Sequence, residues 1–301
     1  MSEASRKPGQ PKSILLATDL SPRCDRALDR ALALSQQWQA KLVVLHVLET
    51  RPDVDRDPAI PSWRRPPDPA SLALQQLLAD VGTAIERAEI VIADGDAAEA
   101  VARVAAEKEC DLVVTGIARD ELLGRFFLGS TVDRLLRGAQ KPVLVVRNRV
   151  RHSYRHIAVA ADFSDASRHA LETAGRYFPG QPITLVHAYD APMSGLLADP
   201  EASRRRHRDV AMVDYAAFLE TLDPHEGLAK RLRPLVEFGR PADLLRQAVR
   251  DLGIGLVVLG TRGRGALAEA LIGSVAKEIL REVPCDALIA VEPAPAAASG
   301  R

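Results

Sequence analysis

Short apolar runs alternate with amphipathic segments along most of this chain, and the alternation predicts strands separated by helices. The runs are rich in Val, Ile and Leu and cover residues 14–17, 42–47, 90–93, 112–115, 143–146, 157–160, 183–188, 235–238, 256–259 and 287–291. Most are continuous rather than alternating, which is typical of parallel strands buried on both faces. Five such runs in each half, with helices between them, predict two tandem, doubly wound, Rossmann-like α/β domains.

The segments between the runs carry helix signals. Ser21-Pro22 precedes apolar residues at helical spacing, and the pair is typical of an N-cap followed by proline at the first helical position. Asp96 opens the segment 97–107 in the same way, and Asp243 lies at the start of the matching segment in the second half. The sequence therefore predicts helices that begin directly after Ser21 and Asp96 and close to Asp243.

The two halves of the chain repeat the same landmarks at offsets of 141 to 144 residues. The pairs are Asp19 and Asp162, His46 and His187, Gly116 and Gly260, and Gly129 and Gly273. A period of this length indicates two whole domains rather than a solenoid, whose units span about 20 to 50 residues. We predict domains over residues 12–147 and 154–292, with the joint in the charged stretch 147–155.

A glycine-rich segment follows the fourth apolar run of the second half. It reads Gly260-Thr-Arg-Gly263, then nine residues, then Gly273-Ser274. Glycine permits φ > 0 and lets backbone N–H groups approach an anion. The N-terminus of a following helix also favours negative charge, and Ser274 adds a hydroxyl donor. The segment predicts a phosphate-binding loop.

Two carboxylates accompany this loop. In doubly wound sheets, ligands bind beyond the carboxyl ends of the strands, where the strand order reverses. Asp19 and Asp162 end the first strand of each half, so they point toward this crevice and can accept a hydrogen bond from a base amino group or a ribose hydroxyl. The alternative is that each Asp only caps the next helix. The nearby glycine loop favours the ligand.

Composition and charge exclude several classes of partner. The 301 residues include 40 Lys and Arg and 40 Asp and Glu, so we expect neither nucleic acid nor a membrane surface as a partner. No stretch approaches 18 apolar residues, and the N-terminus lacks the apolar core of a signal peptide. The three cysteines lack metal-ligand spacing. We therefore expect a cytoplasmic protein without a metal site.

Signatures of catalysis are missing from the sequence. There is no Gly-x-x-x-x-Gly-Lys-Ser loop and no Gly-x-Gly-x-x-Gly after a strand, which argues against P-loop NTPases and dinucleotide oxidoreductases. No nucleophile, base and orienting group form a recognisable set. We expect no dedicated catalytic residues.

The motifs together resemble those of the universal stress protein family. The resemblance is carried by the glycine spacing from Gly260 to Ser274, by the Asp that ends strand one and by Lys141-Pro-Val-Leu-Val-Val at the fifth strand. The same domain occurs twice, so the chain is similar to the tandem-domain members of that family. The resemblance covers nearly the whole chain.

The resemblance implies an adenine-nucleotide site in the second half. In nucleotide-binding members, the strand-one Asp and a backbone group at the end of strand two hold adenine, and the glycine motif holds the ribose and phosphates. The corresponding positions are Asp162, Ala188, Leu259, Gly260, Gly263, Gly273, Ser274 and Val275. The expected ligand is ATP, ADP or AMP, with or without Mg²⁺.

The first half carries a degenerate copy of this site. Its corresponding positions are Asp19, Val47, Gly116, Arg119, Gly129, Ser130 and Thr131. Arg119 replaces the second glycine, and if the turn requires φ > 0 there, a non-glycine residue costs about 1 to 2 kcal/mol. The Arg side chain either crowds the phosphate or donates to it. We predict a first-half pocket that is empty, weak or altered.

The resemblance finally implies a regulatory role. We expect a stress-response protein whose bound nucleotide controls its shape or its partners, with at most slow ATP hydrolysis. Two alternatives remain open, namely an ATPase or nucleotidyl-transfer enzyme and a protein-interaction module that binds no nucleotide. Related domains pair through their last strands. The expected partners are therefore the other half of the chain, a second copy in a homodimer and an unidentified protein.

Overall fold

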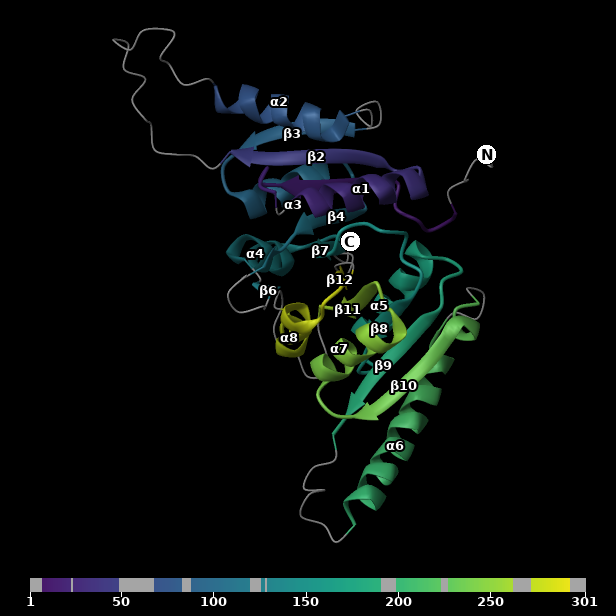
Figure 1. Ribbon diagram of the computed structural model, residues 1–301. Coiled ribbons are helices and arrows are strands. Elements are labelled where there is room, and N and C mark those ends of the chain that lie inside the picture. Colours follow the sequence, from purple (N-terminus) through teal and green to yellow (C-terminus); the bar gives the residue numbers. More distant parts are fainter. Residues whose placement is uncertain are drawn as a thin grey trace, which may run out of the picture.

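Ten strands form a continuous sheet in the computed structural model, which describes residues 7–22, 24–48, 68–82, 88–119, 126–127, 129–190, 199–222, 227–261 and 272–292. The strand order is β10-β9-β8-β11-β12-β7-β4-β1-β2-β3. Each half therefore contributes five strands in the same order, with its first strand in the middle and its last strand at the junction. Figure 1 shows this arrangement, with α2 and α6 at opposite ends of the molecule.

The first half contains five strands of the large sheet and four helices among its described residues. The strands are β1 (Ser13–Thr18), β2 (Lys41–Leu48), β3 (Ala88–Asp94), β4 (Leu112–Gly116) and β7 (Val143–Val146). The helices are α1 (Asp25–Trp38), α2 (Pro69–Val81), α3 (Ala97–Glu107) and α4 (Ser130–Gly138). Two short strands, β5 (Ala118–Arg119) and β6 (Phe126–Phe127), pair with each other outside the large sheet.

The second half repeats this order. Its strands are β8 (Ile157–Ala160), β9 (Ile183–Tyr189), β10 (Leu232–Phe238), β11 (Leu256–Gly260) and β12 (Asp286–Ala290). Its helices are α5 (Asp165–Tyr177), α6 (Pro200–Glu220), the 3₁₀ helix η5 (Ala229–Arg231), α7 (Pro241–Leu252) and α8 (Ser274–Glu282). The predicted fold, two tandem doubly wound parallel sheets, is confirmed.

Helices cover both faces of the sheet, and this explains the continuous apolar runs. Leu15 and Leu16 are neighbours in β1, and both are fully buried, although they point to opposite faces. Side chains of α1, α2, α5 and α6 pack on one face, and those of α3, α4, α7 and α8 pack on the other. Each of these two cores contains residues from both halves of the chain.

The two halves join through their last strands. β7 and β12 are antiparallel, with Leu144 opposite Leu288, Val143 opposite Ile289 and Val145 opposite Ala287. Residues 144 positions apart in the sequence thus occupy equivalent places on the two sides of this pair. A pseudo-two-fold axis passes between Leu144 and Leu288 and relates one half to the other.

The predicted start of the first helix is wrong. α1 begins at Asp25, with Cys24 as its N-cap residue and no side-chain cap. Ser21 lies in a preceding turn, where its carbonyl accepts a hydrogen bond from the Cys24 N–H at 2.8 Å and its own N–H donates to Asp19 at 2.9 Å. The turn satisfies these groups locally, so the helix starts three residues later than the Ser-Pro pair predicts.

The other two helix starts agree with the sequence. The Asp96 carboxylate accepts hydrogen bonds from the N–H groups of Ala98 and Glu99, and this cap opens α3. Asp243 lies in the first turn of α7, where a carboxylate is favoured by the helix dipole. Across the ranges that the structure describes, no helix combines the length and the apolar character needed to cross a bilayer.

Candidate functional site

The candidate nucleotide site of the second half lies at the carboxyl ends of β8, β9 and β11. β8 is the central strand and pairs with β9 on one side and β11 on the other. The chain winds outward from β8 to β10 and then crosses back to β11, so the strand order reverses between β8 and β11. Asp162, Ala188 and Leu259 all lie at this edge of the sheet, where doubly wound sheets bind ligands.

Asp162 is a half-buried carboxylate that organises the start of α5. Its Oδ1 accepts hydrogen bonds from Ser164 N at 3.1 Å, Ser164 Oγ at 2.5 Å and Ser167 Oγ at 2.6 Å. Ser164, and not Asp162, is the N-cap residue, because its hydroxyl accepts from the Ser167 N–H. The alternative that Asp162 only caps the next helix therefore holds in part. Its carboxylate accepts a hydrogen bond from the hydroxyl of the N-cap residue Ser164, but it does not itself cap the helix.

Gly260, the last residue of β11, packs closely against Ala166 of α5. A Cβ at this position would lie 2.8 Å from the carbonyl oxygen of Ala166 and 2.9 Å from its Cβ. Both distances are shorter than real side chains tolerate, so β11 can approach α5 this closely only with glycine here. The glycine at this place does not by itself indicate a ligand.

Gly273 differs from Gly260 in this respect. It is the N-cap residue of α8, and its N–H donates to the carbonyl of Thr261 at 3.0 Å, which joins the residues on either side of the segment 262–271. The nearest atom to a Cβ at Gly273 is that Thr261 oxygen, 3.9 Å away, and the φ is −58°. Neither its φ nor its packing against the described residues requires glycine at Gly273.

The N-terminus of α8 is suited to an anion. Ser274 and Val275 are its first two residues, and both are exposed. Gly273 makes no side-chain cap, so the first N–H groups of the helix are available to a negatively charged group. The structure brings these residues and Leu259 to the same edge of the sheet. Gly263, the remaining predicted residue, lies outside the described residues.

Phe163, which no sequence pattern singles out, follows Asp162 in a left-handed backbone conformation. Its φ is 61°, and its ring stacks on the ring of His187 with centroids 4.2 Å apart. Leu20, which follows Asp19 in the first half, has a φ of 60°. Such a conformation costs a non-glycine residue about 1 to 2 kcal/mol. The backbone is therefore strained just after the first strand of each half. The sequence contains no glycine there that would signal it.

The first half keeps the same frame. Asp19, Val47 and Gly116 lie at the carboxyl ends of β1, β2 and β4. Partial burial acts to raise the pKa of Asp19, but hydrogen bonds from Ser21 and Cys24 outweigh it and leave the pKa below its ordinary value. The carboxylate is thus charged at neutral pH. Gly129 is the N-cap residue of α4, and a Cβ added to it would meet no atom within 4 Å, so it resembles Gly273.

Ser130 and Thr131 begin α4 and are exposed, as Ser274 and Val275 are at the start of α8. Arg119 lies in β5, opposite Phe126 of β6, in a short antiparallel pair. An extended strand has no residue with φ > 0, so the backbone cost considered for Arg119 does not arise. β6 contacts α8 of the second half, so this segment of the degenerate copy packs against the helix that begins at Gly273.

The cysteines are protonated at neutral pH. Burial raises the pKa of Cys24 to about 11 and that of Cys285 to about 12. Burial also raises the pKa of Cys110. None of them is a thiolate nucleophile. Over the part of the chain that the structure describes, no three His, Cys, Asp or Glu side chains gather in a way that could hold a metal ion.

Comparisons with known proteins agree with this geometry. A family model described as "Universal stress protein family" matches residues 11–147 and again residues 153–290. A universal stress protein of Mycolicibacterium smegmatis is 27% identical over 301 residues, which cover 92% of this chain and 96% of the relative. A Thermus aquaticus protein described as "Universal stress protein in QAH/OAS sulfhydrylase 3'region" is 33% identical over 141 residues, covering 45% of this chain and 98% of the relative.

The fold is also found among solved structures. A universal stress protein from Archaeoglobus fulgidus matches with a TM-score of 0.64 and 20% sequence identity, covering 95% of this chain and 98% of that chain. At this identity, the match concerns the fold. It extends over both halves, as does the match to the Mycolicibacterium protein.

Proposed function

This chain belongs to the universal stress protein family, and we propose that it is a cytoplasmic stress-response regulator that binds one adenine nucleotide in its second half. The observation that carries this proposal is Gly273, a glycine at a helix N-terminus that neither its φ nor its packing against the part of the chain that the structure describes requires. A ligand that lies against the backbone at this place accounts for the missing side chain. The first half keeps the fold and an equivalent glycine, Gly129, but it has Arg119 in place of the second glycine, and for this reason we propose that it binds nucleotide weakly or not at all.

The described residues fit such a ligand. Asp162 accepts a hydrogen bond from the adenine amino group or from a ribose hydroxyl, and the backbone of Ala188 borders the base. The N–H groups at the start of α8 and the Ser274 hydroxyl donate to phosphate oxygens. ATP, ADP and AMP share these features, and Mg²⁺ accompanies the di- or triphosphate through its phosphate oxygens. The bound nucleotide controls the shape of the protein or its choice of partners.

A nucleotide-free interaction module is the competing function. Two observations favour it, because Asp162 already serves the turn before α5 and Gly260 is required by packing against Ala166. Both residues would then be present without any ligand. Gly273 separates the two functions, since a methyl group added there would obstruct a nucleotide bound against the backbone, whereas a module that binds no nucleotide would lose only the preference of the N-cap for glycine.

The test compares two matched variants, Gly273→Ala and Gly129→Ala. Both place Ala at a helix N-cap, where its cost is similar in the two variants, about 1 kcal/mol or less. Both added methyl groups have room in the protein alone. In titration calorimetry with ATP, ADP and AMP, we expect the wild type and Gly129→Ala to bind one nucleotide per chain. We expect Gly273→Ala to bind at least about 10-fold more weakly, which corresponds to about 1.4 kcal/mol.

Three outcomes of this titration would lead to other conclusions. Absence of binding by the wild type to all three nucleotides would establish the interaction module. Two equal sites per chain would contradict the asymmetry between the halves. Release of phosphate in the presence of Mg²⁺, abolished by Gly273→Ala, would assign the site to an ATPase.

A further inference from the structure

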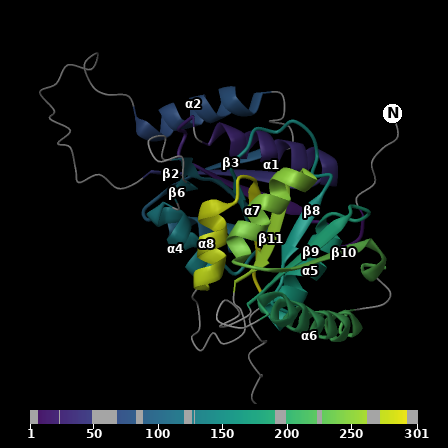
Figure 2. The ribbon, with the colours of Figure 1, turned by 60° about the horizontal axis from the view of Figure 1, so that its bottom comes forward.

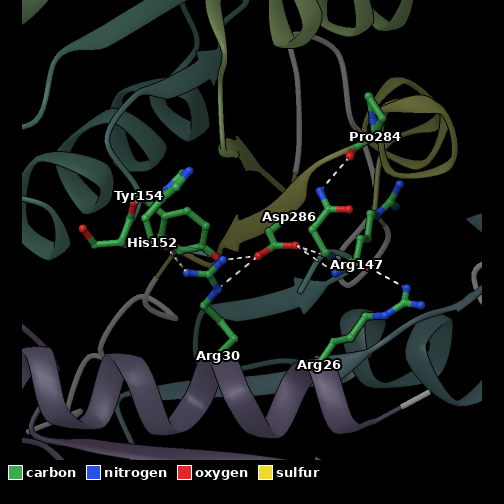
Figure 3. A network of polar contacts seen from close by, with 9 residues as sticks. Arg26, Arg30, Arg147, His152, Tyr154, Pro284 and Asp286 are labelled. Carbon is green, nitrogen blue, oxygen red and sulfur yellow. Dashed lines mark hydrogen bonds and ion pairs between the residues drawn. The ribbon is translucent and has the colours of Figure 1, made fainter. Parts of the chain in front are cut away.

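A buried polar network lies beside the β7–β12 junction (Figure 3). Asp286, the first residue of β12, is fully buried. Its carboxylate forms an ion pair with Arg30 at 3.3 Å and accepts the Tyr154 hydroxyl at 2.5 Å. It also accepts the backbone N–H groups of Arg147 at 2.8 Å and Asn148 at 3.1 Å. Four groups therefore compensate this one buried negative charge.

The two arginines of the network also have contacts through their guanidinium groups. The Arg30 guanidinium lies over the Tyr154 ring, 4.1 Å from its centroid, and donates to the carbonyl of His152 at 3.2 Å. Arg147 is 1% exposed, and its guanidinium donates to the carbonyl of Val283. Burial lowers the pKa of Arg147 to about 10, so it remains a cation at neutral pH. Burial also raises the pKa of Tyr154, which keeps its hydroxyl protonated as a donor.

The charges come from different halves. Arg30 and Arg147 belong to the first half, whereas Asp286 belongs to the second. Buried charges are tolerated when they are paired and hydrogen-bonded, and a buried charge that has lost its partner is strongly destabilising. Each half therefore supplies the compensation that the other half requires.

The network occurs on one side of the pseudo-two-fold axis only. The position equivalent to Asp286 in the first half is Pro142, and the position equivalent to Arg147 in the second half is Val291. The offset of 143 residues that relates Asp19 to Asp162 makes the buried Thr173 the equivalent of Arg30. Where one side of the junction has a carboxylate and two guanidinium groups, the other side has proline, threonine and valine, none of which is charged.

A second charge pair lies at the axis on the opposite face of the sheet. Asp133 of α4 and Lys277 of α8 occupy equivalent positions, 144 residues apart, and their side chains form an ion pair at 3.0 Å. Figure 1 and Figure 2 both show α4 and α8 side by side. Because equivalent residues meet at a two-fold axis, a pair of like halves would place Asp133 against Asp133 or Lys277 against Lys277.

We propose that this junction selects its partner, so that a first half pairs only with a second half. A pair of first halves would bury Arg30 and Arg147 opposite Pro142, without a carboxylate, twice. A pair of second halves would bury Asp286 opposite Thr173 and Val291, without a cation, again twice. Unpaired buried charges and like charges at the axis both act against these alternatives.

The selection has a consequence for assembly. The junction surface of each half is occupied within the chain, so a homodimer uses other surfaces or exchanges complementary halves between copies. Whether the homodimer uses other surfaces or exchanges halves, every β7 strand pairs with a β12 strand. The partner that this surface fits is the complementary half of the same sequence.

The experiment starts from the full chain with a protease site inserted after Arg149, which is exposed. Two versions with different isotope labels are cleaved, mixed, incubated in mild denaturant to permit exchange and measured by native mass spectrometry. We expect label-mixed dimers that contain one first half and one second half, in at least about 10-fold excess over dimers of like halves. Like pairs in statistical proportion, or halves that separate after cleavage, would overturn the proposal.

A charge exchange in the uncut chain provides a second measurement. Asp133→Lys places two lysines at the axis and should lower the urea midpoint of unfolding, as should Lys277→Asp with two aspartates. The double variant Asp133→Lys/Lys277→Asp restores an ion pair and should recover most of the midpoint. A double variant whose loss equals the sum of the two single losses would count against selection at the axis.

Discussion

Asp286 has a buried carboxylate whose partners lie on three other segments of the chain. It interacts with Arg30 of α1, with Tyr154 in the segment between β7 and β8, and with the backbone directly after β7. A carboxylate in the apolar interior is unstable unless it is paired and its lone pairs are satisfied. The stability of this residue therefore depends on the correct placement of both halves.

Replacing Asp286 by Asn leaves the buried Arg30 guanidinium without its carboxylate and removes the negative charge beside Arg147. We expect the free energy of unfolding to fall by about 3 to 5 kcal/mol, because the loss of one partner of a buried ion pair leaves the other charge uncompensated. Urea denaturation measures this loss. Asp243→Asn is the control, since its carboxylate pairs with Arg246 at the surface, and it should lower the free energy by less than about 1 kcal/mol. An unchanged midpoint for Asp286→Asn would show that the network contributes nothing.

At the scale of elements, the two edge strands of the sheet avoid further pairing in different ways. β10 contains Pro234, which lacks a backbone donor and is tolerated at an edge. This strand begins at Leu232, three residues before the apolar run from which it was predicted. β3 instead carries Glu89, whose carboxylate bridges Lys41 of β2 and Lys108 beyond α3. These two ion pairs thus link the edge strand β3 to β2 and to the residue that follows α3.

The contribution of Glu89 should depend on pH. Hydrogen bonds from Lys108 and Lys41 lower the pKa of this carboxyl from 4.5 to about 2. A carboxyl with a lowered folded-state pKa stabilises the protein above pH 4.5, and this stabilisation is lost as the pH falls toward about 2. Glu89→Gln should lower the free energy of unfolding by about 0.5 to 1 kcal/mol at pH 7, because the pair is solvent-screened.

Urea denaturation of the wild type and Glu89→Gln at pH 7 and near pH 2 tests this dependence. The difference in free energy of unfolding between the two proteins should vanish near pH 2. Glu201→Gln is the control, since Glu201 forms only a long, exposed pair with Arg205 at 3.8 Å, and it should change the free energy by less than about 0.5 kcal/mol at pH 7. An equal difference for Glu89→Gln at both pH values would rule out the lowered pKa as its cause.

At the scale of the whole molecule, the halves share one sheet and both of their cores. Trp38, at the end of α1, packs against Tyr177 and Phe178 of the second half, with ring centroids 5.7 Å and 5.5 Å apart. The Tyr177 hydroxyl donates to the carbonyl of Asp111 at 3.1 Å. These contacts cross the junction away from the β7–β12 pair, so we expect the two halves to unfold together.

Nucleotide binding in the second half should therefore stabilise the first half. Both tryptophans, Trp38 and Trp63, belong to the first half, so tryptophan fluorescence reports its unfolding. At 100 times the dissociation constant, ATP should raise the free energy of unfolding by about 2.7 kcal/mol and move the fluorescence midpoint with it. At the same ATP concentration, Gly273→Ala should reduce this stabilisation to about 1.4 kcal/mol or less, because its binding is at least about 10-fold weaker. Independent halves would instead show a shift in circular dichroism while the fluorescence midpoint stays in place.

The candidate site could be predicted in part, because some of its residues owe their identity to local geometry. A glycine spacing, an Asp at a strand end and an apolar run depend on neighbours in the sequence, and these features predict a site at Asp162 and Gly273. The left-handed backbone of Phe163 and the packing of Gly260 on Ala166 arise from contacts between separate elements. No local pattern signals them.

The sequence by itself determined the class of fold, the duplication and the family resemblance, since continuous apolar runs require burial on both faces and repeated landmarks require repeated domains. Only the tertiary structure decided that α1 starts at Asp25, that Arg119 lies in a strand and that Arg147 is buried beside Asp286. The physical reason is distance along the chain. Arg147 and Asp286 are 139 residues apart. In the sequence, a charged residue in a connecting stretch indicates an exposed side chain. Only the fold brings the Asp286 carboxylate to the backbone N–H of Arg147.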